Sequence, residues 1–482
     1  MTAAPRPADV AAPHDGDGRL TADGSLVASR GPLVSAAMAM VAVLGYVGAL
    51  VLAHLLDAPS YSQYAAAATL LGTVGVFAAA LIPMPLTHTI RSHPPGSEGR
   101  RSGMAFAWSV STGCGLLAAL VTGLITAAFA PPLVAATVAV AAMVLCLCSP
   151  VWGWTHGELL FVRDSWMVVA EVSVRVLVSV GVVLVGGSAG GALVGFVAGS
   201  AVVLLTTPRR LWRDLSWRPD VLRERRRWAE TGDIAVTQLI VYALVGADVV
   251  LVALLGDHDA ASAGFQALST LAKAPVYVAA GAVAVAFPLL RSRHAHTESI
   301  LNATLGSFAV LALAAAVVVA TVPRELMLLV FPERYAGSLA LLPVLAAAGI
   351  GYAALTTFTS VLLGLRAYRR CQAGLLAAVV LMPAGLLLGW QVDGIPGLAT
   401  GVALAALLAA GALGVAAAPL LPPRTPRRAL SALLAAGVVG ALLQAAASVP
   451  ALWVVAVLLL AGAVLRLLRR ASTHPTGERE TR

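Results

Sequence analysis

Four charged side chains lie inside long apolar stretches of this sequence: Glu171, Arg175, Asp248 and Lys273. If these stretches cross a membrane, each charge costs roughly 2.5–3.5 kcal/mol at bilayer depth on insertion scales, so each needs a partner or a polar cavity. Charged groups placed in this way can bind a charged substrate, carry a coupling ion or neutralise one another. Their spacing separates them into two pairs.

Glu171 and Arg175 are four residues apart, the spacing at which side chains meet on one helix face. They either neutralise each other so that both can be buried, or leave Arg175 facing a cavity that takes an anionic substrate. Lys273 has only neutral residues three and four positions away, so it faces a polar cavity or pairs with another helix. Asp248 is the candidate partner, in a structural bridge. Alternatively, Lys273 binds a phosphate-like group as a point charge, or Asp248 couples an ion.

The elements that carry these residues are apolar runs of about 20 residues, the length of a transmembrane helix. Hydrophobic residues make up 59% of the 482 residues and charged residues 11%, against roughly 25% charged in soluble domains. The mean hydropathy is +0.88. These values exclude an ordinary cytosolic enzyme, a disordered protein and a secreted disulfide scaffold. The predicted spans are 33–56, 62–86, 103–129, 132–151, 166–186, 188–206, 232–255, 262–289, 300–322, 337–364, 371–391, 394–420, 429–447 and 449–468.

The arginines test this count of fourteen. With each loop numbered after the helix that it follows, the even-numbered loops carry twenty arginines and the odd-numbered loops carry only Arg324 and Arg334. Loops on the cytoplasmic side of membrane proteins are enriched in arginine and lysine. This uneven distribution of arginines arises only if every predicted span crosses the membrane, because the loss of one span would exchange the two sides for all later loops. The sequence therefore predicts an all-α multi-pass membrane protein with about 14 transmembrane helices and both termini in the cytoplasm.

The net charge of +9 is what such loops produce, and we assign the chain no nucleic-acid partner. The segment 208–229 interleaves tryptophans and leucines with eight arginines, a pattern typical of basic helices on anionic membrane surfaces. We interpret it as a lipid-facing linker that contacts anionic phospholipid, the alternative being a partner or regulatory site. Residues 1–31 lack the basic and apolar regions of a signal peptide and are expected to be a disordered cytoplasmic tail. Residues 469–482 are expected to be a second cytoplasmic tail.

Sites for metal or cofactor chemistry are not indicated by the sequence. The four cysteines form no CxxC pair and read as small buried hydrophobes, and the histidines are scattered. Because the one lysine lies in Ala272-Lys273-Ala274, there is no Walker A loop, and there is no HExxH sequence. The longest outer loop, around 323–336, is too short for a catalytic domain. We therefore predict no enzyme activity, no metal and no cofactor.

Close helix packing is predicted at two glycine patterns, the GxxxGxxxG run at Gly191, Gly195 and Gly199 and the pair Gly397 and Gly401.

Two helices contain a faint repeat, Tyr64–Gly72 and Phe265–Lys273, each followed by a proline. An offset of six helices gives both copies the same direction, hence a parallel repeat. Two further stretches are Gly246-Ala-Asp-Val-Val-Leu and Leu329-Val-Phe-Pro-Glu-Arg-Tyr335-Ala-Gly-Ser-Leu-Ala-Leu-Leu-Pro343. With the fourteen helices, these residues resemble the oligosaccharide and polysaccharide flippases of the multidrug/oligosaccharidyl-lipid/polysaccharide exporter superfamily. Phe265 and Pro332 depart from that pattern, which commonly has tyrosine and glycine there.

The resemblance implies two six-helix lobes related by a parallel pseudo-two-fold repeat, an N-lobe over 32–207 and a C-lobe over 230–421, with two added helices over 429–468. It implies a plasma (inner) membrane transporter that moves a polyprenyl-pyrophosphate-linked oligosaccharide to the outer leaflet by alternating access, with polysaccharide assembly enzymes as candidate partners. Lys273 and Arg175 would then offset the pyrophosphate. A cation-coupled multidrug antiporter of the same superfamily is the alternative, kept open by Asp248 and Glu171. A membrane polymerase or ligase is disfavoured by the short outer loops.

Overall fold

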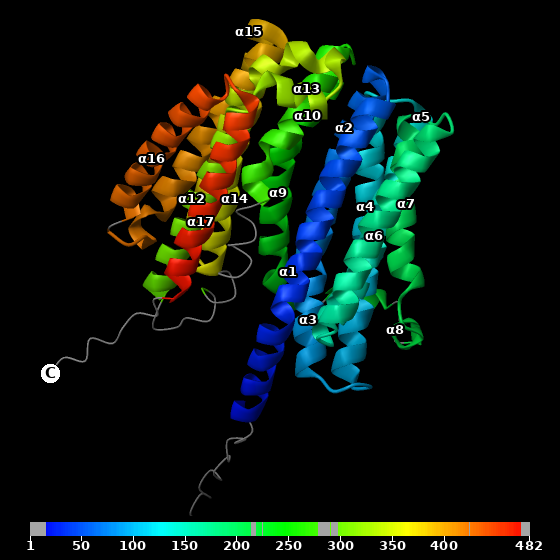
Figure 1. The fold of residues 1–482 in the computed structure, drawn as a ribbon. Coiled ribbons are helices and arrows are strands. Elements are labelled where there is room, and N and C mark those ends of the chain that lie inside the picture. The colour runs from blue at the N-terminus through cyan, green and yellow to red at the C-terminus, as the bar shows by residue number, and fades with distance from the viewer. Residues whose placement is uncertain are drawn as a thin grey trace, which may run out of the picture.

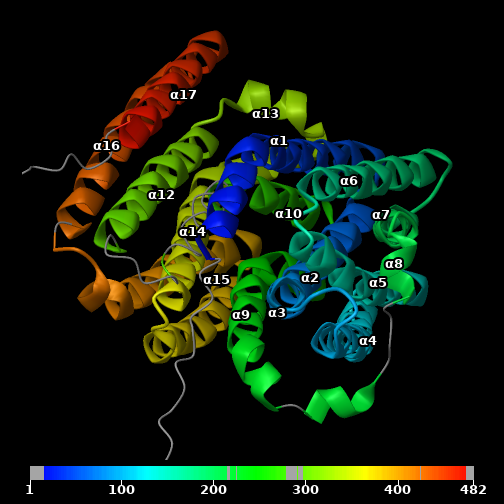
Figure 2. The ribbon, with the colours of Figure 1, turned by 90° about the horizontal axis from the view of Figure 1, so that it is seen from below.

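A computed structural model describes residues 16–213, 218–223, 225–277, 290, 297–423 and 425–473. All elements in these ranges are helical. Figure 1 shows them as long helices running side by side, and Figure 2, seen from below, shows two groups of helices with α1 and α9 between them. We call the lower end of Figure 1 the arginine-rich end, because the turn between α3 (Pro83–Ser92) and α4 (Glu98–Ala127) and the short helix α8 (Arg209–Arg213) lie there, and the upper end the arginine-poor end.

The N-lobe consists of seven helices: α1 (Gly16–Leu55), α2 (Ala58–Leu81), α3 (Pro83–Ser92), α4 (Glu98–Ala127), α5 (Pro132–Gly157), α6 (Phe161–Leu184) and α7 (Ala189–Leu205). Helix α5 packs on α4 and α7, and α6 packs on α7 and α1. Asp57 caps the N-terminus of α2 by accepting a hydrogen bond from the Ser60 amide, which ends the tight turn from α1. Between α6 and α7 the glycine run packs as the sequence predicts. A Cβ atom at Gly195 would lie 2.3 Å from the Arg175 carbonyl oxygen, so only glycine allows this approach.

The C-lobe comprises α9 (Arg225–Leu255), α10 (Ala260–Ala272), α12 (Thr297–Ala320), α13 (Arg324–Val330), the 3₁₀ helix η2 (Glu333–Leu341), α14 (Leu342–Gly364) and α15 (Tyr368–Ala417), which leads into η3 (Ala418–Leu420). Helix α15 is a hairpin of two arms. Asp393 and Gly394 leave the helical conformation, Gly394 with a φ of +53° that glycine adopts readily. A Cβ at Gly389 would lie 2.3 Å from the Gly397 carbonyl oxygen, so the arms touch backbone to backbone.

Two terminal helices, α16 (Thr425–Ala446) and α17 (Pro450–Thr473), lie at the outer side of α12 (Figure 2). The indole Nε1 of Trp453 donates a hydrogen bond of 3.2 Å to the Thr321 hydroxyl at the end of α12. Most of the leucines of the pair remain exposed, as expected for side chains that face lipid.

Thirteen of the fourteen predicted runs lie over described helices, and the eighth does so as far as residue 277. Eleven of the described helices are long and apolar enough to cross a membrane, and α7 is a shorter apolar helix. Among the eleven, α15 contains two predicted runs as its two arms. Helix α10, which is shorter than these, begins the predicted eighth run. The predicted all-α fold with about 14 transmembrane helices is thus confirmed for the described chain.

Three boundaries were predicted wrongly. Helix α1 already begins at Gly16, whereas 1–31 was expected to be disordered; the helix continues back from the span through Pro32, whose missing N–H removes one helical hydrogen bond. Helix α17 continues to Thr473, beyond the predicted end at 468. The eighth run, 262–289, breaks at Lys273, and its part beyond residue 277 lies outside the described residues.

The basic linker is also packed differently from the prediction. It contains α8 (Arg209–Arg213) and the 3₁₀ helix η1 (Pro219–Arg223). Leu211 and Val221 are buried in an N-lobe cluster with residues of α3 and α4, so the expectation that they face lipid is wrong. The ring of Trp228 lies 5.4 Å from Phe106 of α4 in an edge-on contact. Aromatic side chains of the N-lobe offer a dry surface, and the linker buries its apolar face there.

The largest hydrophobic cluster belongs mainly to the C-lobe but includes N-lobe residues near the arginine-poor end, among them Leu52, Ala53, Leu56, Tyr61 and Ala65. Helices α2 and α9 form the main contact between the lobes. A Cβ at Gly246 of α9 would lie 2.6 Å from the Thr69 methyl group of α2, so the two helices approach closely. The lobes therefore share one apolar core at this end.

Candidate functional site

Lys273 lies at a break between helical segments inside the bundle. Helix α10 ends at Ala272, Lys273 has a φ of −80° and a ψ of 0°, and residues 274–277 are helical again. Pro275 has no N–H to donate to the Leu271 carbonyl, which removes one helical hydrogen bond and explains the break. Helix α14 passes directly over it, since a Cβ at Gly349 would lie 1.9 Å from the Ala272 carbonyl oxygen.

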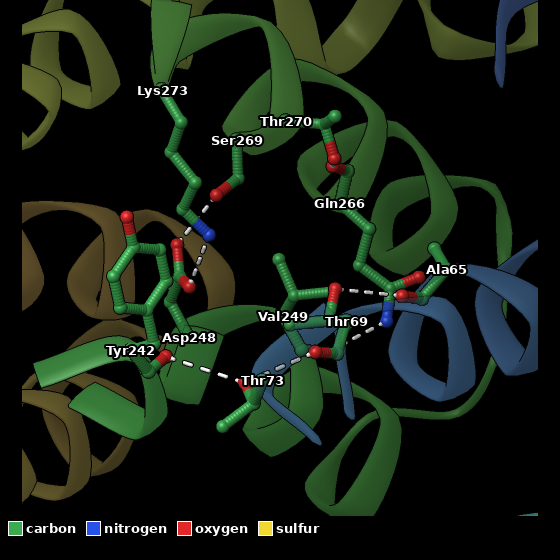
Figure 3. Close-up of polar contacts among 10 residues, drawn as sticks. All are labelled: Ala65, Thr69, Thr73, Tyr242, Asp248, Val249, Gln266, Ser269, Thr270 and Lys273. Atoms are coloured by element: carbon green, nitrogen blue, oxygen red, sulfur yellow. Dashed lines mark hydrogen bonds and ion pairs between the residues drawn. The ribbon is translucent and has the colours of Figure 1, made fainter. Parts of the chain in front are cut away.

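The break directs Lys273 toward Asp248 of α9 (Figure 3). The Lys273 Nζ atom lies 2.8 Å from Oδ1 of Asp248, and the Ser269 hydroxyl donates to Oδ2. The Asp248 side chain is 1% exposed and that of Lys273 9%. The Lys273 Nζ also lies 5.6 Å from the ring centroid of Tyr352, close enough for a cation–π contact. The expected partnership of Asp248 and Lys273 is thus present, as a buried and fully bridged pair.

Further polar groups surround this pair (Figure 3). The Gln266 amide Nε2 donates a hydrogen bond of 2.9 Å to the Val249 carbonyl oxygen. Its Oε1 atom and the Tyr352 hydroxyl are buried without a hydrogen-bond partner among the described residues. Thr73 of α2 is 3.5 Å from the Tyr242 carbonyl oxygen of α9, which joins the two lobes beside the pair.

Glu171 and Arg175 form an ion pair along α6. The Arg175 guanidinium also lies 4.6 Å from the ring centroid of Phe196 on α7. The Arg175 side chain is 26% exposed and that of Glu171 11%, so this pair is more accessible than the C-lobe pair. The predicted spacing therefore does bring the two charges together.

The four predicted residues thus form two separate neutral pairs, one in each lobe. Within the described ranges, no hydrogen bond or ion pair links one pair to the other. A cavity of about 290 Å³ lies between the lobes, bordered by α2 and α9, but its lining of Thr69, Thr73, Gly246 and apolar neighbours includes none of the four. Lys273 and Arg175 therefore do not present free positive charge, and an anion that binds either must compete with a carboxylate.

Two arginines acquire roles that the sequence did not indicate. Arg100, counted among the loop arginines, is buried in α4 and pairs with Glu158 at the end of α5. Arg334, which the sequence shows only as one of two arginines in the odd-numbered loops, donates to the backbone carbonyls of Ala53 and Leu56 at the end of α1 in the other lobe. Backbone acceptors leave no signature in a sequence, so neither spacing nor composition reveals such contacts. The described residues contain no group of three or more histidine, cysteine or acidic side chains that could hold a metal ion.

This arrangement of helices is similar in fold to solved transporters of the multidrug/oligosaccharidyl-lipid/polysaccharide (MOP) exporter superfamily. A lipid II flippase, MurJ, in an inward closed conformation aligns with 91% of this chain and 100% of its own, with a TM-score of 0.66 and 13% identity. The Vibrio cholerae MATE transporter VcmN aligns with 83% of this chain and 98% of its own, with a TM-score of 0.57 and 15% identity. An inward-facing multidrug resistance MATE transporter of the MOP superfamily aligns with 80% and 95%, with a TM-score of 0.54 and 14% identity.

At these identities the likeness is one of fold. It confirms the resemblance to the superfamily at that level. No protein-family profile matches the sequence, and no curated protein matches it.

Proposed function

We propose that this protein is a membrane transporter that flips a polyprenyl-pyrophosphate-linked oligosaccharide from the inner to the outer leaflet by alternating access of its two lobes. The observation that carries the proposal is the extent of the likeness to a lipid II flippase, which spans 91% of this chain and all of that one. The alignments with the two MATE transporters have lower TM-scores and cover less of the chain.

Under this proposal the two ion pairs receive the head group by exchange of partners. A pyrophosphate offers several anionic oxygens, and Arg175 matches such a group in two-point geometry whereas Lys273 acts as a point charge. Glu171 and Asp248 hold these cations in neutral pairs while the substrate is absent. Arg175 would contact the head group before Lys273 does, because its side chain is more exposed and less of the buried structure must open to reach it.

The proposed orientation puts the arginine-rich end in the cytoplasm, following the enrichment of arginine in cytoplasmic loops. Both ends of the described chain, the start of α1 and the end of α17, lie at that end (Figure 1). Arg209 and Arg210 of the linker are exposed there, and we assign them to anionic phospholipid head groups. Replacing both by glutamine should weaken retention of phosphatidylglycerol in purified protein. The same end is where polysaccharide assembly enzymes would deliver the substrate.

The second candidate function is a cation-coupled multidrug antiporter. The likeness to MATE transporters and the buried carboxylates of Glu171 and Asp248 favour it. Each carboxylate, however, already neutralises a cation of this chain, so binding a coupling ion would require the pair to open. A deletion strain that becomes sensitive to cationic drugs, while its surface glycan is unchanged, would favour the antiporter over the flippase.

The decisive experiment follows the lipid-linked oligosaccharide after deletion of the gene. Accumulation in the inner leaflet, with loss of surface glycan, is expected of a flippase, and the accumulated sugar names the cargo. An unchanged pool in a strain without a second transporter of this fold would contradict the proposal.

A charge-removal experiment then tests the role of Lys273. Lys273→Ala alone leaves Asp248 buried without a counter-charge, so loss of export would mix misfolding with loss of binding. The double variant Asp248→Asn/Lys273→Met removes both charges at once. If it folds and inserts but no longer flips, the Lys273 charge serves the substrate; if it flips normally, the pair is structural. The matched control is Glu98→Gln/Arg218→Gln, which removes an exposed pair.

A further inference from the structure

Arg334 joins the two lobes at the arginine-poor end. Its Nη2 atom donates to the Ala53 carbonyl and, at 2.5 Å, to the Leu56 carbonyl. These carbonyls belong to the last turn of α1 and to the turn that follows, where the helix has no further N–H groups to satisfy them. The guanidinium therefore caps a helix of the N-lobe from a segment of the C-lobe.

The segment that carries Arg334 is fixed to its own lobe. The 3₁₀ helix η2 packs on α10, where a Cβ at Gly264 would lie 2.5 Å from the Ser338 hydroxyl, so only glycine admits this contact. Tyr335 next to the arginine is 1% exposed. Because η2 is packed on α10, Arg334 moves together with the C-lobe whenever that lobe moves relative to α1.

Two other contacts cross between the lobes at the same place. The rings of Tyr61 and Tyr335 lie 6.0 Å apart. The Ser62 hydroxyl is 3.2 Å from Nδ1 of His258 in the turn before α10. Together with the Arg334 contacts they seal the arginine-poor end, at the level of the shared apolar core.

We propose that Arg334 is a latch: by capping α1 across the lobe boundary, it holds the arginine-poor end closed and sets how often that end opens. When Arg334 moves away, the two carbonyl oxygens become exposed to water, and water molecules then donate hydrogen bonds to them. The latch therefore makes opening less frequent without preventing it, as a transporter that must alternate requires. This inference does not depend on the identity of the cargo.

The test measures access to the seam directly. Ala65 lies in the shared core, one helical turn beyond Tyr61, and Ala65→Cys is a small change there. In a background with the four native cysteines replaced, the purified protein in nanodiscs is treated with a membrane-impermeant maleimide. We expect Arg334→Ala to raise the labelling rate about tenfold, which corresponds to about 1.4 kcal/mol in the opening equilibrium. Arg334→Lys should lie between, because an ammonium group lacks the planar fork of the guanidinium.

The matched control is Arg324→Ala, in the same connection between α12 and α14, at the start of α13. It should leave the labelling rate unchanged. An unchanged rate in Arg334→Ala, in protein with the thermal stability of the parent, would overturn the latch, as would an equal increase in the Arg324→Ala control. If Arg334→Ala does not fold, Arg334→Lys and Arg334→Gln provide the same comparison, and parental rates in both would equally refute the inference.

Discussion

Asp248→Asn should destabilise the protein more than the loss of any exposed ion pair, because it leaves the Lys273 ammonium without a counter-charge inside the bundle. The side chains are 1% and 9% exposed and the charged atoms 2.8 Å apart. Removing one partner of a buried pair costs about 3–5 kcal/mol, since the remaining charge is left desolvated. The Ser269 hydroxyl and the Tyr352 ring stay in place but supply no formal negative charge.

The assay is the free energy of unfolding in mixed micelles, measured for Asp248→Asn, for Lys273→Met and for both together. Each single variant should lose about 3–5 kcal/mol. The double variant should lose much less than the sum, because exchange of both partners for neutral groups is often close to neutral. For the exposed Glu98–Arg218 pair, 71% and 49% exposed, Glu98→Gln should cost about 0–1 kcal/mol.

The refuting results are specific. If Asp248→Asn unfolds at the same free energy as the parent, water must reach Lys273, and the description of a dry pair is wrong. If the losses of the two single variants simply add in the double variant, the two side chains are energetically independent in spite of their contact. Either result would also remove the premise that a substrate must compete with Asp248 for Lys273.

Two further predictions concern helix contacts. Gly349→Ala should destabilise the protein by about 1–3 kcal/mol, because its Cβ would lie 1.9 Å from the Ala272 carbonyl oxygen. Gly306→Ala, where nothing lies within 4 Å, should be neutral or slightly stabilising in the same thermal unfolding assay. Trp453→Phe removes the hydrogen bond to Thr321, worth about 1 kcal/mol, and should speed hydrogen exchange in α17; unchanged exchange would show that apolar contacts alone hold the terminal pair.

The fold was predictable because two independent signals agree along this chain. Apolar length marks each span, and the placement of arginines tests the phase of all of them together. The pairing of Asp248 with Lys273 was predictable for a related reason: two isolated charges in apolar helices have few ways to avoid their desolvation cost. The four residues chosen as a site do interact in pairs, while their role with a substrate stays a proposal.

Other features depend on contacts that a sequence does not display. Pro275 is visible in the sequence, but the close approach of Gly349 of α14 to the Ala272 carbonyl oxygen at the break is not. The amphipathic linker shows an apolar face without showing whether lipid or protein covers it, and here Phe106 of α4 helps to do so. The acceptors of Arg334 are backbone carbonyls, which every residue carries.

The docked linker limits how the two lobes can move relative to each other. It is the only covalent connection between them, and its anchored part reaches Val221, buried on the N-lobe. From Arg223 to the start of α9 at Arg225 is two residues, a tether of at most about 7 Å when extended. Because Trp228 also contacts Phe106, the first turns of α9 stay close to the N-lobe and act as a pivot. Large excursions of the C-lobe must then be rotations about this point, with the greatest travel at the opposite end of the bundle, where Arg334 is.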